Sequence, residues 1–320
     1  PNGKLGAYRI KRQRVGRGQD MQAWRVLILL VLTVSTLGGC SQNNQLTGGL
    51  LVSSNATGDW EVFVVDVDQS RARQVTNENG LDIEGSWSPN GENIAIASAR
   101  GPCRNQGSCD LEVVIVKPDG SVLAQLTNNT RTDDQPAWSP DGTRIAFRSD
   151  RTDDVELFVM DADGGNVEQL TNSPGEDWTP TWSPDGSLLA FASNRNGNWD
   201  IFVMRPDGAE LRQVTDGVGD HWLPSWSPHE PVLAFAGNRD GNWDIFTVRP
   251  DGTELHQVVT HEALDSEPVW SPDGSALAFV RKQAGLSSAL MFVELSSGKV
   301  SNGNVDGFPT DWFESTKNPD

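Results

Sequence analysis

The chain has 320 residues, and with 44 acidic against 25 basic side chains its formal net charge is −19. This excess of negative charge argues against nucleic acid and anionic membrane surfaces as partners. The region rich in tryptophan and glycine shows no sustained 3.6-residue periodicity, so we expect strands and turns and few helices.

The first 39 residues have the pattern of an export leader. Met21 opens a segment whose apolar run covers residues 26–37, which is too short to span a bilayer and suits a signal-peptide core. The run ends in Leu37-Gly38-Gly39-Cys40, and small residues before a cysteine resemble a bacterial lipobox. We therefore expect residues 1–39 to be an upstream extension and lipoprotein signal peptide, with Cys40 lipidated. An ordinary secretory signal with a chance cysteine is the alternative.

Residues 40–49 then form the lipidated cysteine and a flexible tether, "CSQNNQLTGG". This organisation predicts an extracytoplasmic, membrane-anchored lipoprotein of a bacterium, on the periplasmic side of the outer membrane or on the cell surface. The leader holds seven basic residues and one acid, so the remainder keeps 18 basic and 43 acidic side chains, a formal charge of −25.

The two remaining cysteines, Cys103 and Cys109, lie together in the loop "SARGPCRNQGSCD". Outside the cytoplasm such a pair is expected to form a local disulfide. A metal site is the alternative, but it needs more ligands than this pair, and none lie nearby in the sequence.

Six tryptophans mark an internal repeat. They are separated by 51, 44, 44, 44 and 42 residues: Trp87, Trp138, Trp182, Trp226, Trp270 and Trp312. A period of this length that contains four short strand patterns is typical of a β-propeller, with one blade per repeat.

One unit, residues 179–220, shows the four strands. "TPTW" is followed by the turn Ser-Pro-Asp-Gly, then by "SLLAFAS", "WDIFVM", a Pro-Asp-Gly turn and "LRQVT". Proline presets φ for a turn, and Asp-Gly supplies the side-chain hydrogen bond and the positive φ. Small residues recur in the second strand and should let the blades stack closely: Ala146, Ala190, Ala234 and Ala278.

The ends of the repeat region determine the blade count. Residues 48–76 lack the tryptophan strand, whereas residues 306–313, "DGFPTDWF", match a first strand with nothing after it. Joined, these two parts complete one blade. We predict an all-β, six-bladed β-propeller with split-blade closure over residues 50–313, followed by a C-terminal tail, residues 314–320.

The repeated "WSPDG…IAF…S.R…DIFVM…DG…QLT" pattern resembles that of TolB-like six-bladed propellers. The resemblance covers roughly residues 48–313. Two repeats depart from it: His229-Glu230-Pro231 replaces Asp-Gly in one turn, and residues 280–292 lack the usual Asn-Arg loop. The resemblance implies the propeller fold more than it implies any particular partner.

Variable loops gather on one face of such a ring, opposite the regular Pro-Asp-Gly turns, and functional residues concentrate on such loops. Each segment leading into a tryptophan strand carries an acid there: Asp82, Asp133, Asp177, Asp220, Asp265 and Asp306. These acids could circle the channel mouth and, with the aromatic side chains of Trp178, Trp222 and Phe308, bind a partner. The alternative is that they cap turns. Acids of the third strands, such as Glu156 and Asp200, are expected to pair with loop arginines (Arg151, Arg195, Arg239) or with backbone.

No pattern for catalysis stands out. There is no G-x-S-x-G elbow, and the four histidines have no metal-ligand spacing. We therefore predict no catalytic residues, no metal ligands and no cofactor, and a scaffold that binds an envelope protein or glycan, contacts the membrane through its lipid anchor and does not bind nucleic acid. The alternative is a Ca²⁺-dependent hydrolase or lyase with its site at the central channel.

Overall fold

The computed structural model describes residues 49–66, 71–77, 80–99, 110–152, 154–239, 241–283, 288–303 and 307–313. These residues form strands and turns, and none of them lies in a helix. Over the same ranges the structure has no helix with the length and apolar character needed to cross a membrane.

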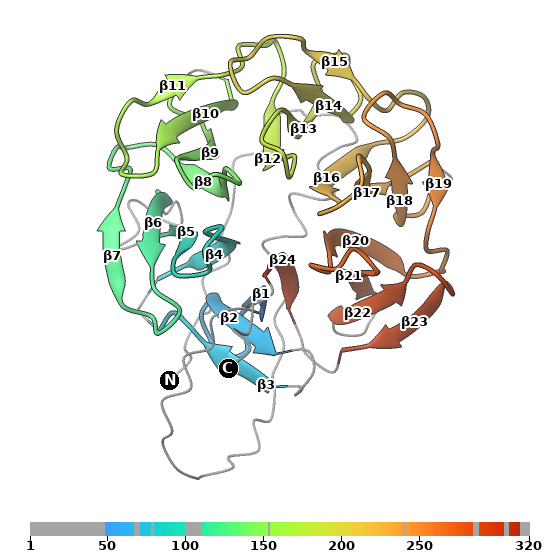
Figure 1. The fold of residues 1–320 in the computed structure, drawn as a ribbon, viewed down its shortest axis with the longest axis horizontal. Coiled ribbons are helices and arrows are strands. Elements are labelled where there is room, and N and C mark those ends of the chain that lie inside the picture. The colour runs from blue at the N-terminus through green and yellow to red at the C-terminus, as the bar shows by residue number, and fades with distance from the viewer. Residues whose placement is uncertain are drawn as a thin grey trace, which may run out of the picture.

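In the part of the chain that the structure describes, twenty-four strands form six four-stranded antiparallel sheets arranged as blades around a central axis (Figure 1). The inner strands are β24 (Phe308–Phe313), β4 (Asp82–Trp87), β8 (Asp133–Trp138), β12 (Asp177–Trp182), β16 (His221–Trp226) and β20 (Leu264–Trp270). The second strands are β1 (Gly49–Ser54), β5 (Ile94–Ser98), β9 (Arg144–Ser149), β13 (Leu189–Ser193), β17 (Leu233–Gly237) and β21 (Ala276–Lys282).

The third strands are β2 (Glu61–Asp66), β6 (Glu112–Val116), β10 (Glu156–Asp161), β14 (Asp200–Met204), β18 (Asp244–Val248) and β22 (Ser288–Glu294). The outer strands are β3 (Arg71–Gln74), β7 (Val122–Gln125), β11 (Glu168–Gln169), β15 (Arg212–Gln213), β19 (His256–Gln257) and β23 (Lys299–Asn302). We number the blades in this order, so blade 1 holds β24 and β1–β3, and blade 6 holds β20–β23.

Blade 1 confirms the predicted split closure. Its sheet has the order β24-β1-β2-β3, so the strand from the end of the repeat region pairs with the strand from its beginning. The register places Gly49 opposite Phe313 and Ser53 opposite Phe308. Antiparallel pairing of β24 with β1, with one register shift between Leu51 and Val52, thereby closes the ring, and β1 has no free edge.

The hydrophobic core lies between neighbouring blades, where small and large side chains of the second strands pack against the next blade. Four phenylalanines at equivalent positions are completely buried: Phe147, Phe191, Phe235 and Phe279. The alanines just before them in the same strands are also completely buried, as predicted for close stacking of blades. Apolar residues on consecutive positions suit strands that are covered on both faces.

The predicted turns also form. In the turn after β12, the amide of Gly186 donates to the carbonyl oxygen of Ser183 at 2.8 Å, and Gly186 has a φ of +70°. The Asp185 carboxylate accepts hydrogen bonds from the Ser183 hydroxyl (2.6 Å) and the Ser187 amide (3.0 Å). These hydrogen bonds lower the pKa of Asp185 below its usual value, and they keep this face of the ring short and regular.

Candidate functional site

The inner strands surround a central channel with a cavity of about 340 Å³. All six inner strands contribute to its wall, which is lined by backbone, proline, tryptophan and a few acidic side chains. The channel and the loops at its mouth are the candidate functional site, because only here do all the blades converge.

The repeating tryptophans join one blade to the next at the channel wall. The indole Nε1 of Trp182 donates to the carbonyl oxygen of Ala137 (3.1 Å), and that of Trp226 donates to Thr181 (3.2 Å). Trp270 repeats the contact with Ser225 at 3.0 Å. The tryptophans that define the repeat are therefore structural connections between blades.

A second ring in the channel is built from residues with left-handed backbone conformation. They occupy the third position of β4, β8, β12 and β16 and the equivalent position of β20, with φ values between +54° and +59°: Glu84, Gln135, Thr179, Leu223 and Glu267. Each lies at a register shift between the inner and second strands, as expected for a β-bulge. The bulge turns these residues into the wall of the cavity.

Side chains of this ring cap the backbone of the neighbouring blade. The carboxylate of Glu84 accepts a hydrogen bond from the Gln135 amide (3.1 Å), and the Gln135 side-chain oxygen accepts one from the Thr179 amide (2.7 Å). These channel residues are not among the site residues predicted from the sequence. The proline that follows the bulge residue in four blades was the available signal, because a proline interrupts a strand ladder.

Three of the predicted acids are buried beside arginine. Asp133, Asp177 and Asp265 are each 0 % exposed, and none of them lines the channel cavity. Their partners are loop or strand arginines, each with a nitrogen 2.8 Å from the carboxylate: Arg151, Arg195 and Arg281, respectively. Asp82 is buried at the equivalent place in blade 2.

The arginine partners differ from those expected. Acids of the third strands were predicted to pair either with the loop arginines Arg151, Arg195 and Arg239 or with backbone. Glu156 makes the backbone contact: it accepts a hydrogen bond from the Ser173 amide (2.8 Å) and a second one from the Thr171 hydroxyl (2.6 Å). Arg195 instead pairs with Asp177, the first-strand acid of its own blade 4, whereas Glu156 belongs to the preceding blade 3. We call this arrangement of third-strand acid, first-strand acid and arginine the clasp.

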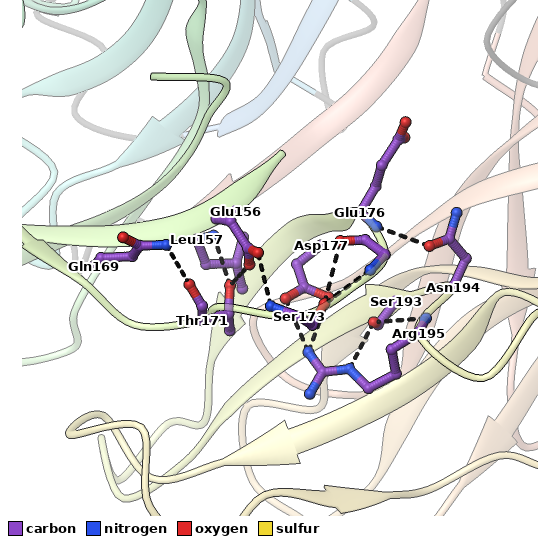
Figure 2. Close-up of polar contacts among 11 residues, drawn as sticks. Glu156, Leu157, Gln169, Thr171, Ser173, Glu176, Asp177, Ser193, Asn194 and Arg195 are labelled. Atoms are coloured by element: carbon purple, nitrogen blue, oxygen red, sulfur yellow. Dashed lines mark hydrogen bonds and ion pairs between the residues drawn. The ribbon is translucent and has the colours of Figure 1, made fainter. Parts of the chain in front are cut away.

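Figure 2 shows the clasp between blades 3 and 4. The guanidinium of Arg195 donates to both oxygens of Asp177 (2.9 and 2.8 Å) and to the Ser193 hydroxyl (2.8 Å), and it lies over the ring of Phe191. Burial, followed by the charge of Asp177, raises the pKa of Glu156 to about 7. The clasp therefore holds two acids close together in a desolvated joint between blades.

The aromatic side chains form a cluster across blades 4 and 5. Trp222 is 4 % exposed and lies 3.8 Å from Trp199 between ring centroids, whereas Trp178 is half-buried, with its centroid 5.9 Å from that of Trp222. The Arg148 guanidinium, paired with Asp134, lies 3.6 Å from the Trp178 ring centroid. Only a half-buried member such as Trp178 can reach a partner.

The last predicted contacts lie at the edges of this surface. Phe308 is half-buried against Trp60, with centroids 5.3 Å apart. Asp220 precedes β16, is half-buried and accepts a hydrogen bond from the Trp199 amide (3.1 Å). His221 takes the strand position that aspartate has in blades 2, 3, 4 and 6. Asp306, Cys40, Cys103 and Cys109 lie outside the described residues.

Among the residues that the structure describes, no three histidine, cysteine, aspartate or glutamate side chains are grouped so as to hold a metal ion. Asp311, in the channel wall, accepts a hydrogen bond from the Trp87 amide at 2.7 Å. Burial raises the pKa of Asp311 to about 6. The acidic side chains Asp311 and Glu84 of the channel wall thus accept hydrogen bonds from the backbone of neighbouring strands.

Comparison with known proteins identifies similar chains. Residues 168–310 match the model of the TolB beta propeller domain, PD40. Over 81 residues, 25 % of this chain, the sequence is 32 % identical to a protein TolB homolog of Chlorobium luteolum (strain DSM 273 / BCRC 81028 / 2530). That stretch spans only 17 % of the length of the relative.

Two solved structures share the fold. The putative TolB from Agrobacterium tumefaciens is similar with a TM-score of 0.68 and 22 % identity, covering 82 % of this chain and 91 % of that one. TolB from Acinetobacter baumannii is similar with a TM-score of 0.70 and 18 % identity, covering 82 % of this chain and 65 % of that one. At these identities the likeness concerns the fold.

Proposed function

Because this chain carries a TolB-like PD40 β-propeller, we propose that it is a binding scaffold of the bacterial envelope that docks another envelope protein on its loop-bearing face. The observation that carries the proposal is the asymmetry between the two faces of the ring. One face consists of short, regular turns that contain proline, aspartate and glycine. The other surrounds the channel mouth and presents half-buried aromatic side chains: Trp60, Trp178, Trp243 and Phe308.

These aromatic side chains suit protein recognition. Each has a large apolar body, and the indoles add an N–H donor, so they stabilise a complex while keeping it specific. Trp178 is already fixed, because its Nε1 donates to Glu176 at 3.0 Å and Arg148 covers one side of its ring. A fixed aromatic side chain loses little conformational entropy on binding.

We assign different roles to the predicted acids. Asp82, Asp133, Asp177 and Asp265 are buried in the joints between blades, and we propose that they hold the docking face in shape. Asp220, Trp178 and Phe308 are half-buried on that face, and we propose them as contacts. The buried Trp222 supports Trp178 from beneath.

Site-specific photo-crosslinking in the producing bacterium tests the docking face. Benzoylphenylalanine replaces Phe308 in one variant and Asp207, an exposed residue of an opposite-face turn, in the matched control. We expect an adduct with an envelope protein from position 308 and none from position 207. Equal adducts from both positions, an adduct with a glycan, or none from position 308 would contradict the proposal.

Membrane attachment is a further part of the proposal. The apolar run of residues 26–37 and the Leu37-Gly38-Gly39-Cys40 motif support lipidation of Cys40, and two or more acyl chains suffice for stable anchoring. Metabolic labelling with an alkynyl palmitate should modify the wild-type protein and not the Cys40→Ser variant. Label retained in that variant would refute attachment at Cys40.

We also propose the disulfide between Cys103 and Cys109. Both cysteines lie in one short segment of a chain with an export leader. Iodoacetamide should alkylate them only after reduction, as read by mass spectrometry of the intact protein. Alkylation of both without reductant would show that they are free thiols.

A further inference from the structure

The clasp arginine has the same two anchors in blades 3 and 4. In blade 4, Arg195 donates from Nε to the Ser193 hydroxyl (2.8 Å) and from Nη2 to buried Asp177 (2.8 Å). In blade 3, Arg151 makes the same contacts with the equivalent serine (2.9 Å) and aspartate (2.8 Å). Both guanidinium groups lie over phenylalanine rings of their own blade. A guanidinium held in this way directs its hydrogen bonds to its own blade, so less of it is available to a partner.

Blade 5 keeps the arginine, Arg239, and replaces both anchors. His221 stands at the aspartate position, and Gly237 stands at the serine position. The imidazole Nδ1 lies 2.8 Å from Oδ1 of Asp200, and the ring packs edge-on against Phe235 with centroids 5.4 Å apart. His221 therefore contacts the phenylalanine whose equivalents in blades 3, 4 and 6 lie beneath the arginine.

Glycine at position 237 accompanies the histidine at position 221, with which it is paired across the two strands. A Cβ there would lie 3.2 Å from Cδ2 of His221 and 3.0 Å from the Phe246 ring, so a serine would crowd the imidazole. The aspartate-to-histidine and serine-to-glycine changes together make one alternative joint, and in that joint Arg239 has no anchor.

Arg239 lies instead against the loop that enters blade 5. Its Nη2 is 3.9 Å from the position that a Cβ of Gly217 would occupy. Among the residues that the structure describes, Arg239 has no hydrogen-bond or ion-pair partner, although Asp216 and Asp220 belong to the same loop. Val218, between two glycines with positive φ, is 75 % exposed.

Chain topology places these residues on the docking face. Arg239 follows the second strand of blade 5, and Val218 precedes its first strand, so both lie at the end of the ring that carries Trp178 and Phe308. The exposed Arg131, on the loop that enters blade 3, likewise has no ion-pair partner among the described residues, so Arg239 is distinguished by the exposed apolar Val218 on the loop beside it.

We propose that Arg239 and Val218 form a carboxylate-recognition point, which binds an acidic residue with an apolar neighbour on an extended segment of the partner protein. The proposal rests on the proposed docking function and names the chemistry of the partner. The planar guanidinium can donate two parallel hydrogen bonds to one carboxylate, and Val218 supplies the apolar contact beside it. The net negative charge of the chain disfavours acidic segments in general, and the pair of Arg239 and Val218 favours a segment in which an acidic residue stands beside an apolar one.

The test is a titration of the ¹⁵N-labelled protein with the peptide acetyl-Gly-Leu-Asp-Leu-Gly-amide, followed through the amide signals of Gly217 and Gly219. The control peptide has asparagine in place of aspartate. We expect saturable shifts with the acidic peptide and affinity weaker by about fivefold for the control peptide. Absence of shifts, or equal affinity for both peptides, would overturn the proposal.

Two variants locate the charge. Arg239→Gln should weaken binding of the acidic peptide by about fivefold, whereas Arg205→Gln, at an exposed arginine near an opposite-face turn, should leave it unchanged. His221→Asp/Gly237→Ser restores both anchors, so it should sequester Arg239 and weaken binding equally without removing a positive charge from the loop. Wild-type affinity in either blade 5 variant would refute the assignment.

The two proposals fail in different ways. If position 308 crosslinks an envelope protein but the acidic peptide does not bind, the docking face stands and its carboxylate chemistry is wrong. If the peptide binds through Arg239 but no adduct forms at position 308, the recognition point stands and the docking function as stated is wrong.

Discussion

Replacing Arg195 by methionine should weaken the joint between blades 3 and 4 more than any surface substitution. The side chain is 13 % exposed and bonds the fully buried carboxylate of Asp177 at 2.8 Å. Methionine keeps an apolar contact with the phenylalanine rings but leaves a buried charge without its counter-ion beside Glu156. Breaking a buried ion pair from one side costs about 3–5 kcal/mol.

Urea unfolding monitored by tryptophan fluorescence measures this cost, and thermal unfolding should show a decrease in Tm of roughly 6–10 °C. The matched control is Arg205→Met, whose ion pair with Glu210 spans 3.5 Å and is more than half exposed, so its loss should cost less than about 0.5 kcal/mol. The double variant Asp177→Asn/Arg195→Met should recover at least half of the lost stability, because no buried charge remains. A single variant within about 1 kcal/mol of wild type, or a double variant no better than the single, would refute this reasoning.

Three further predictions concern pH, the tryptophans and the loop beside Arg239. Folding raises the pKa of Glu156 to about 7, so the native state binds the extra proton and the free energy of unfolding should fall as pH rises from about 4.5 to 7, by up to about 3 kcal/mol. Urea titrations should show this slope in wild type and a smaller slope in Glu156→Gln, where Asp311, with its pKa raised to about 6, still contributes. An unchanged slope in Glu156→Gln would show that Glu156 does not cause it. Trp270→Phe should lower the free energy of unfolding, measured in urea, by about 1–2 kcal/mol, because the carbonyl of Ser225 loses its hydrogen-bond donor. Trp138→Phe should lower it less, because the indole N–H of Trp138 has no partner among the described residues. Equal losses in the two variants would contradict the role of the Trp270 hydrogen bond. Gly219→Ala should lower Tm strongly because φ is +98° and a Cβ would overlap the carbonyl oxygen of Asn238, whereas Gly241→Ala, with open space around it, should lower Tm mildly; similar shifts would refute the clash.

The blade count and the closure could be predicted because both depend on a repeated local pattern. The spacing of tryptophan and of Ser-Pro-Asp-Gly specifies one sheet per unit, and the incomplete units at residues 48–76 and 306–313 complement one another. Those features depend on hydrogen bonds within a turn or a ladder, and neighbouring residues in the sequence decide them.

The candidate site was less predictable because it depends on which blade each side chain faces. Spacing from the tryptophan located Asp177 near the channel mouth, but only packing shows that its carboxylate faces Arg195. The same spacing from the tryptophan selected Asp220 in blade 5. In the structure the strand begins one residue later, at His221, and His221 takes the place of the aspartate. The bulge that brings Glu84 into the channel requires a positive φ at this residue. Glutamate seldom adopts such a conformation, so its presence in the sequence does not predict a bulge.

The pairing of β24 with β1 has a consequence for how the protein folds. Until Phe308–Phe313 is available, the backbone of Gly49–Ser54 lacks a partner along one side, with apolar residues at its centre. A strand in that condition is a template for pairing with another chain. The ring must also bring together parts of the chain that are very distant in sequence, and such contacts slow folding. The closing step should therefore be late, and incompletely synthesised or truncated chains should aggregate rather than accumulate as a stable five-bladed ring.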